Sequence, residues 1–195
     1  MALSDAAKTG AAIFVGAVQF GIFLVVAEAL YPEYSVYGNA ISDLGANCTD
    51  GVCVIQPSSS LVFEASVIIL GLLVITGAYY FMRAFKWKPG AAIVGIAGLG
   101  AVGVGLFPET TGAVHGIFSL ITFLFAGLSA LVVARFQRKP MFYFSIILGS
   151  LTLVALLLYA SKLYLGLGQG GMERMVAYPA LLWAVGFGGH LMNLD

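Results

Sequence analysis

Six apolar stretches, each long enough to cross a bilayer as a helix, follow one another along this chain of 195 residues. About 20 apolar residues are needed to span a hydrocarbon core of ~30 Å. Hydrophobic residues make up 61% of the sequence and charged residues only 9%, whereas roughly a quarter of the residues in a soluble domain are charged. We therefore predict an all-α integral membrane protein, a six-helix up-down bundle forming one domain over residues 1–195, with spans at residues 9–31, 61–81, 90–107, 114–133, 141–164 and 175–194.

The basic residues are distributed unevenly between the connecting loops. Two of them, Lys162 and Arg174, fall on one side of the predicted bundle, and the other seven fall on the opposite side: Lys8, Arg83, Lys86, Lys88, Arg135, Arg138 and Lys139. Short loops rich in Lys and Arg stay in the cytoplasm. Both termini are therefore predicted to be cytoplasmic, and the loop of residues 32–60 is predicted to lie outside.

The two cysteines of the chain, Cys48 and Cys53, both lie in this external loop. Paired cysteines on the external side indicate a disulfide formed in an oxidising compartment. Two buried structural thiols, or half of a metal site, are the competing interpretations. No further cysteine completes a zinc-binding set.

A stripe of small residues marks the third span. Ala91, Gly95, Gly98, Ala101 and Gly105 recur at intervals of three and four residues, which places them on one helix face. Small residues let membrane helices approach closely, so this helix is predicted to pack centrally in the bundle. A glycine-lined permeation path is the alternative.

The acids are as unevenly distributed as the bases. Asp5 and Asp195 are predicted to be cytoplasmic, whereas seven others lie in the external loops or outermost helical turns: Glu28, Glu33, Asp43, Asp50, Glu64, Glu109 and Glu173. His115, Lys162 and Arg174 belong to the same side. Ionisable groups at membrane depth usually face protein or a water-filled cavity, which predicts an outward-facing polar pocket. The alternative is a purely structural set of salt bridges that ties the helix ends together.

The two histidines of the chain lie too far apart in the predicted bundle to bind one metal ion. His115 and His190 are expected to differ by roughly 20 Å in depth, at 1.5 Å of rise per helical residue, so they cannot share a haem or a zinc ion. His115 with Glu109, Asp43 and either Glu28 or Glu64 remains as an alternative set of ligands. We predict no cofactor and no nucleic-acid partner, because neither a nucleotide-binding loop nor a basic patch is present.

Within the long loop, the segment from Asn39 to Gly45 alternates polar and apolar residues. Asn39 is a suitable cap for a short helix, and Gly45 is a suitable left-handed end for it. Such a helix, lying in the membrane interface, would place Ser42 and Asp43 over the mouth of the bundle.

Four groups of residues carry a family resemblance: Tyr31-Pro32, Ile41-Ser42-Asp43-Leu44-Gly45, Phe107-Pro108-Glu109 with His115, and Gly171-Met172-Glu173-Arg174 before Trp183. The chain resembles the domain-of-unknown-function nine-nine-eight family (DUF998), six-helix membrane proteins of archaea and bacteria. The resemblance implies a plasma-membrane location and an outer site built from Asp43, Glu109, His115, Glu173 and Arg174, without an established activity. The segment His115-Gly116-Ile117-Phe118 is more faintly similar to Frag1/Sfk1-type proteins, which are associated with lipid remodelling.

Three functional hypotheses follow. The first is a lipid- or amphiphile-binding protein, in which Arg174 holds an anionic headgroup by paired hydrogen bonds and Asp43 and Glu109 orient it. The second is a membrane-embedded hydrolase or transferase, with His115 as general base or as a metal ligand beside the carboxylates. The third is a non-catalytic structural or assembly subunit that forms a homo-oligomer or joins a membrane complex.

The charges also predict specific contacts. Arg174 remains charged at physiological pH and needs acceptors, and it is predicted to pair with at least one of Asp43, Glu109 and Glu64. Glu173 is predicted to cap its helix or to face solvent. The ligand-binding set is therefore predicted to be Ser42, Asp43, Glu109, His115, Glu173, Arg174, Glu28, Glu64 and Lys162.

Overall fold

The computed structural model describes residues 2–49 and 51–194, so the predictions for Asp50 and Asp195 lie outside the described residues. It contains six α-helices: α1 (Asp5–Leu30), α2 (Pro57–Phe85), α3 (Lys88–Leu106), α4 (Ala113–Val133), α5 (Met141–Ala160) and α6 (Gly168–Met192). All six are long and apolar enough to cross a membrane. The prediction of an all-α, six-helix protein with the composition of a multi-pass membrane protein is confirmed.

Five predicted spans agree with these helices to within a few residues, but the sixth was predicted too short. Helix α6 begins at Gly168 rather than at residue 175. Its first turn, Gly168-Gln169-Gly170-Gly171, is neither apolar nor favourable for helix formation, so hydropathy alone places the start too late. Glu173 and Arg174 consequently lie inside the helix and not in the loop before it.

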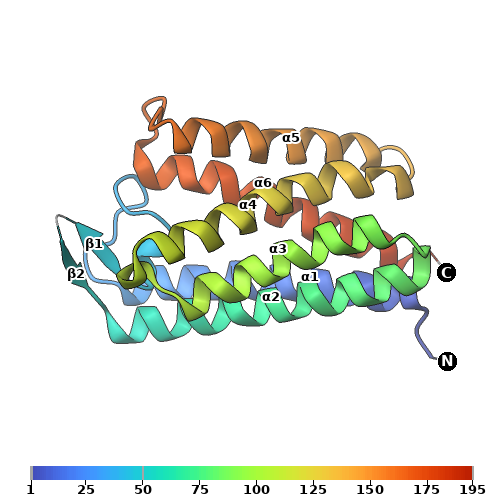
Figure 1. Cartoon of the computed structure of the whole chain (residues 1–195), viewed down its shortest axis with the longest axis horizontal. Helices are drawn as coiled ribbons and strands as arrows, with labels where there is room; N and C mark the ends of the chain where they lie inside the picture. Colours follow the sequence, from blue (N-terminus) through green and yellow to red (C-terminus); the bar gives the residue numbers. More distant parts are fainter. Residues whose placement is uncertain (1, 50, 195) are drawn as a thin grey trace.

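Successive helices run in opposite directions, as predicted (Figure 1). Both chain termini lie at one end of the bundle, which we call the terminal end, and the β1–β2 hairpin lies at the other, which we call the loop end. Each helix packs against the next one along the chain, and α6 packs against α1. The six helices therefore form a closed ring in which the first and last helices are neighbours.

The predicted central position of α3 is wrong, because α3 packs mainly between α2 and α4 as one member of this ring. The packing role of its glycines is confirmed. A Cβ atom at Gly98 would lie 2.8 Å from the carbonyl oxygen of Gly71 in α2, and one at Gly105 would lie 2.8 Å from the carbonyl oxygen of Glu64. Gly103 instead faces Phe118 of α4. The small residues let the backbone of α2 and the Phe118 ring of α4 approach α3 from different sides.

The contact that closes the ring is also made by glycines. Near the terminal end, a Cβ atom at Gly188 of α6 would lie 2.6 Å from the carbonyl oxygen of Gly10 in α1. A Cβ atom at Gly10 would lie 2.4 Å from the carbonyl oxygen of Gly188. Contacts this close between backbones leave no room for a side chain on either helix.

Replacing Gly188 with alanine is therefore expected to lower the free energy of unfolding by about 1–3 kcal/mol, the usual cost of overpacking a close contact. The neighbouring Gly189 has nothing within 4 Å of its Cβ position. Gly189→Ala serves as the control and is expected to be neutral or stabilising, because alanine favours a helix over glycine. Equilibrium unfolding in mixed micelles measures both, and equal effects would contradict the close contact.

The long connection between α1 and α2 covers the loop end. It contains the 3-10 helix η1 (Ser42–Leu44) and a small hairpin of β1 (Asn47–Thr49) and β2 (Val52–Val54), in which Cys48 pairs with Cys53. These two cysteines form a disulfide, as predicted. The connection between α3 and α4 contains a second 3-10 helix, η2 (Glu109–Thr111), and a third, η3 (Ala134–Phe136), follows α4.

The predicted start of the short loop helix is wrong, whereas Gly45 does end it, but not in the predicted conformation. Residue Ile41 precedes η1, and the side chain of Asn39 accepts a hydrogen bond from the amide of Ser35 instead of capping η1. Gly45 has a φ of −79° and is not left-handed. Its amide donates to the carbonyl oxygen of Ser42 at 2.9 Å, which continues the right-handed turn.

Candidate functional site

Arg174 lies in the second turn of α6 and is 5% exposed. One Nη atom forms an ion pair with Glu28 of α1 at 2.5 Å and donates to the hydroxyl of Tyr34 at 2.8 Å. The other Nη atom donates to three backbone carbonyls, those of Val36, Asn39 and Gly170. The guanidinium therefore fastens the start of the long loop to the ends of α1 and α6.

The partner predicted for Arg174 is wrong. Its ion pair is with Glu28 and not with Asp43, Glu109 or Glu64. Glu28 lies in the last turn of α1, 146 positions away in sequence, and the closed ring brings the two helices together. Glu64 accepts a hydrogen bond from Ser60 of its own helix at 2.9 Å and takes no part in this cluster.

Tyr34 supports the same arrangement from the loop. Its hydroxyl donates to the carbonyl oxygen of Ala40 at 2.8 Å while it accepts from Arg174. Burial raises the pKa of Tyr34 above its ordinary value, and the hydrogen bond from Arg174 opposes this shift. Tyr34 therefore acts as a neutral bridge between the guanidinium and the loop.

Glu173 points to a different side of α6 from Arg174 and is 4% exposed, so the prediction that it caps the helix or faces solvent is wrong. Its carboxylate accepts a hydrogen bond from the backbone amide of Ile41, immediately before η1. Within the described residues it has no ion-pair partner. Glu173 thus holds η1 in place from the interior of the bundle.

Asp43, in the middle of η1, is 7% exposed. Its carboxylate accepts hydrogen bonds from the side-chain amide of Asn39 at 2.9 Å and from the backbone amide of Ala40 at 3.2 Å. Burial raises the pKa of Asp43 to about 6; the hydrogen bond from Asn39 opposes this shift, and the charge of Glu109 adds to it. Near neutral pH this carboxyl group is therefore poised to gain or lose a proton.

The raised pKa of Asp43 predicts a pH-dependent stability. An aspartate in the unfolded chain titrates near ~3.9, whereas the folded-state pKa is about 6. The folded state holds the proton more tightly, so this contribution to stability is full below about pH 4 and is lost as the pH rises through 6. We expect a loss on the order of 1–3 kcal/mol over that range.

Asp43→Asn keeps the acceptor oxygen but cannot titrate, and it should remove this part of the pH dependence. Unfolding midpoints measured at pH 4.5 and 7.5 provide the comparison. A variant that loses as much stability as the natural protein between those pH values would show that other groups are responsible.

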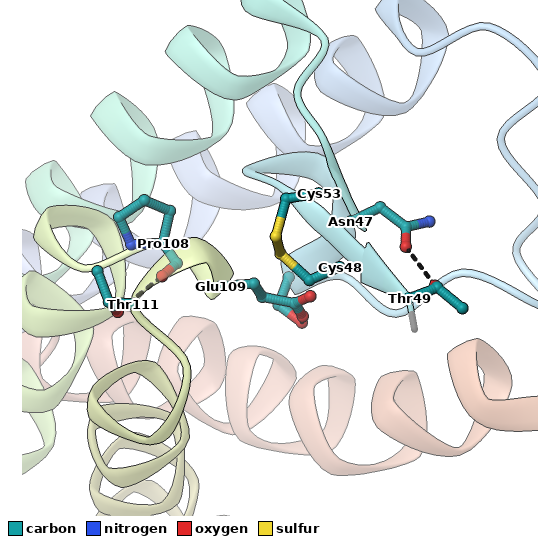
Figure 2. Close-up of a disulfide and its surroundings, with 8 residues drawn as sticks. Asn47, Cys48, Thr49, Cys53, Pro108, Glu109 and Thr111 are labelled. Atoms are coloured by element: carbon teal, nitrogen blue, oxygen red, sulfur yellow. Dashed lines mark hydrogen bonds between the residues drawn. A yellow bond between two sulfur atoms is a disulfide. The ribbon is translucent and has the colours of Figure 1, made fainter. Parts of the chain in front are cut away.

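Ser42 links η1 to the connection between α3 and α4. Its hydroxyl donates to Glu109 of η2 at 2.6 Å. Glu109 lies beside the disulfide-bonded hairpin (Figure 2), so three segments far apart in sequence meet at the loop end. Lys162, in the turn after α5, is exposed and faces the same region.

His115 is 7% exposed in the first turn of α4. Its Nδ1 lies 2.7 Å from the carbonyl oxygen of Phe107, and its Nε2 lies 3.2 Å from the hydroxyl of Ser119. The alternative of a metal held by His115, Glu109 and Asp43 finds no support, because residues 2–49 and 51–194 contain no group of three or more His, Cys, Asp or Glu residues placed to hold a metal ion.

Two hollows meet at η1. An open polar cleft on the loop end is lined by Asn39, Asp43, Glu109, Lys162 and Gln169. Below it, an apolar cavity of about 120 Å³ lies within the ring and is lined by aliphatic and aromatic side chains of α1, α2, α3, α4 and α6, with Ser42, Ser119 and Glu173 among its few polar residues. Ser42 faces the cavity and Asp43 faces the cleft, so η1 separates the two.

The predicted site residues do not form one cluster. Asp43, Glu109 and Lys162 converge on the cleft as a predicted polar pocket requires. Arg174 and Glu173 are buried and Glu28 is partly buried in structural contacts, and Glu64 is separate. Asn39, Gln169 and Ser119 were missed. A signal existed for Ser119, because it stands four residues after His115 in a helix, where side chains are neighbours.

A family model described as "Protein of unknown function (DUF998)" matches residues 14–190, which is most of the chain. The chain belongs to the DUF998 family. Apart from Ile13, which lies one position before the matched range, the residues of the cleft, the cavity and the Arg174 cluster in this DUF998 protein all lie within it. The family match supplies no activity.

No curated protein and no solved structure matches this DUF998 protein. The fainter similarity to Frag1/Sfk1-type proteins therefore stays a prediction.

Proposed function

We propose that this protein binds an amphiphile, a lipid or a lipid-like molecule, at the loop end. The observation that carries the proposal is the meeting of a polar cleft and an apolar cavity at the Ser42–Asp43 segment. A molecule with a polar head and an apolar chain matches both environments at once. The cavity, at about 120 Å³, is close in size to the ~150 Å³ engineered cavity that binds benzene, so it suits the end of one acyl chain.

The charges in the cleft indicate which headgroup fits. Arg174 is already bound by Glu28, Tyr34 and backbone carbonyls, so we no longer assign it to an anionic headgroup. The cleft instead offers one exposed ammonium group, on Lys162, and two carboxylates, on Asp43 and Glu109. Charge-assisted hydrogen bonds are the strongest polar contacts. A zwitterionic head, with phosphate toward Lys162 and an amine toward the carboxylates, complements this set.

We further propose that the loop end faces outward, that the terminal end is cytoplasmic, and that the membrane is the plasma membrane of an archaeon or a bacterium. Seven basic residues lie on the terminal-end segments, which supports this orientation. Single Lys86→Cys and Arg138→Cys variants test it with a membrane-impermeant thiol reagent, because the two natural cysteines are bridged. Labelling of either position from outside intact cells would overturn the topology.

Native mass spectrometry of delipidated protein, titrated with phosphatidylethanolamine or phosphatidylglycerol, tests the binding proposal. We expect one phosphatidylethanolamine per chain and weaker binding of the anionic lipid. The double variant Asp43→Asn, Glu109→Gln should lower the affinity for phosphatidylethanolamine about tenfold or more, equivalent to at least ~1.4 kcal/mol.

Glu33→Gln is the matched control, because Glu33 is an exposed acid of the same loop that does not line the cleft. It should leave the affinity unchanged. Retention of neither lipid, or an equal effect of Glu33→Gln, would contradict the proposal and favour a non-catalytic assembly subunit with a protein partner. Native mass spectra of the same samples would also show any homo-oligomer.

A further inference from the structure

Ser119 lies in the wall of the apolar cavity, and its hydroxyl is hydrogen bonded to the imidazole of His115. The other ring nitrogen, Nδ1, lies 2.7 Å from the carbonyl oxygen of Phe107. A carbonyl oxygen only accepts hydrogen bonds, so Nδ1 must carry a proton. In the neutral imidazole this leaves the lone pair on Nε2, directed at the hydroxyl of Ser119, which is the tautomer that a general base requires.

The imidazole is held firmly in this orientation. His115 is almost fully buried. The ring of Phe107, whose carbonyl orients His115, stacks on Phe118 with the centroids 5.2 Å apart and the planes 3° from parallel. Phe118 directly precedes Ser119 in α4. A nucleophile bonded to a base, with the base oriented by a third group, is the arrangement shared by hydroxyl nucleophiles in enzymes.

The other hydroxyls that α4 presents to the cavity behave differently. Thr122 donates to the carbonyl oxygen of Phe118 at 2.8 Å, and Ser129 donates to that of Phe125 at 2.6 Å. Bonding back to the helix in this way is usual for Ser and Thr. Ser119 is hydrogen bonded to His115 instead, so its hydroxyl is paired with a side chain that can act as a base rather than with a backbone carbonyl.

We propose that Ser119 and His115 form a nucleophile–base pair that transfers an acyl group from an ester-linked amphiphile. The inference rests on the proposed function in one respect, that the ester reaches Ser119 with its chain in the cavity. It differs from the sequence-based hydrolase hypothesis, because the carboxylates play no part: Glu109 is bonded to Ser42 and is not a partner of His115.

Water is the only co-reactant that the proposed reaction needs. Ser119 Oγ forms a bond to the ester carbonyl carbon while its proton passes to His115 Nε2. The carbon–oxygen bond to the alcohol breaks, and the departing oxygen takes that proton. Water then attacks the acyl-serine, gives its proton to Nε2, and releases a carboxylic acid as Ser119 recovers its hydrogen. The net reaction is ester plus water to acid plus alcohol.

A long-chain alkyl fluorophosphonate, which phosphonylates activated serines with loss of fluoride, is the probe for the test. In full-length protein in nanodiscs we expect a single adduct, located on Ser119 by peptide mass spectrometry. Ser119→Ala should abolish labelling. Removing the base with His115→Gln should slow it by about 10²-fold or more. Ser150→Ala, at an exposed position of α5 outside the cavity, is the control and should label at the natural rate.

A second variant keeps the test decisive if His115→Gln folds poorly. Ser119→Cys should be alkylated by N-ethylmaleimide at pH 7 about tenfold faster than Ser129→Cys, because a neighbouring histidine favours the reactive thiolate. Equal alkylation of the two thiols, or fluorophosphonate labelling that is indifferent to His115→Gln, would overturn the inference and leave a structural hydrogen bond.

Failure of the two proposals can be told apart. Protein that retains phosphatidylethanolamine yet is not labelled at Ser119 would refute the nucleophile–base pair and leave lipid binding standing. Labelling of Ser119 in protein that retains no lipid at the cleft would refute the proposed headgroup site and support the pair.

Discussion

Replacement of Arg174 by methionine is expected to lower the free energy of unfolding by about 3–5 kcal/mol, the usual cost of leaving a buried partner charge without its counterion. Methionine fills much of the same space, so the loss comes from Glu28, whose side chain is only 19% exposed. It also comes from the hydroxyl of Tyr34 and three carbonyls that lose their donor. Equilibrium unfolding in mixed micelles gives the value.

Two further variants separate the ion pair from general damage. Adding Glu28→Met to Arg174→Met removes the stranded carboxylate and should restore part of the stability. Arg83→Met breaks an ion pair with Asp5 at the terminal end, where the Arg83 side chain is 53% exposed, and should cost far less stability, because exposed ion pairs contribute little. If Arg174→Met lowers the free energy of unfolding no more than Arg83→Met does, the Arg174 guanidinium does not hold the loop to α1 and α6.

Replacement of Gly170 by alanine is the second change with a large expected effect. A Cβ atom there would lie 2.0 Å from the carbonyl oxygen of Asn39 and 2.5 Å from that of Val36, both backbone atoms of the loop. The loop would have to move away and break the hydrogen bonds that those carbonyls accept from Arg174. We expect a loss at or above the upper end of the ~1–3 kcal/mol range typical of overpacking.

Gly171→Ala provides the matched control in the same helical turn. Its Cβ position lies 3.1 Å from the Leu167 side chain and close to no backbone atom of the loop. The expected change is below about 1 kcal/mol. Beyond stability, Gly170→Ala should weaken phosphatidylethanolamine binding, because Asn39 lines the cleft. If Gly170→Ala lowers the stability but leaves phosphatidylethanolamine binding unchanged, the position of the loop does not determine binding in the cleft.

The number of helices, their alternation and the Cys48–Cys53 disulfide were all predictable from the sequence. Hydropathy predicts each span from its own residues alone, and the distribution of charges predicts only the orientation of the spans. Neither describes which helices are neighbours. The closed ring therefore was not predicted, and α3 was given a central place because its small residues indicate close packing without indicating the partner.

The sequence predicts which residues gather at the loop end, but it predicts their contacts less well. Asp43, Glu109 and Lys162 do gather at one end, as their positions after or before apolar spans require. The partner of Arg174 was missed for two physical reasons: the glycine-rich start of α6 conceals seven helical residues, and Glu28 becomes a neighbour only when α1 and α6 meet. Cavities arise from imperfect packing between helices, which no local pattern records.

The pairing of the first helix with the last has a consequence for how the chain is made. Synthesis proceeds from α1 to α6, so Glu28 is made long before Arg174. During that interval the carboxylate of Glu28 lacks its ion-pair partner. A product truncated before Gly168 keeps that defect permanently and also lacks the α1–α6 seam. Only a chain translated through its sixth helix can pair Glu28 with Arg174 and close the ring of helices.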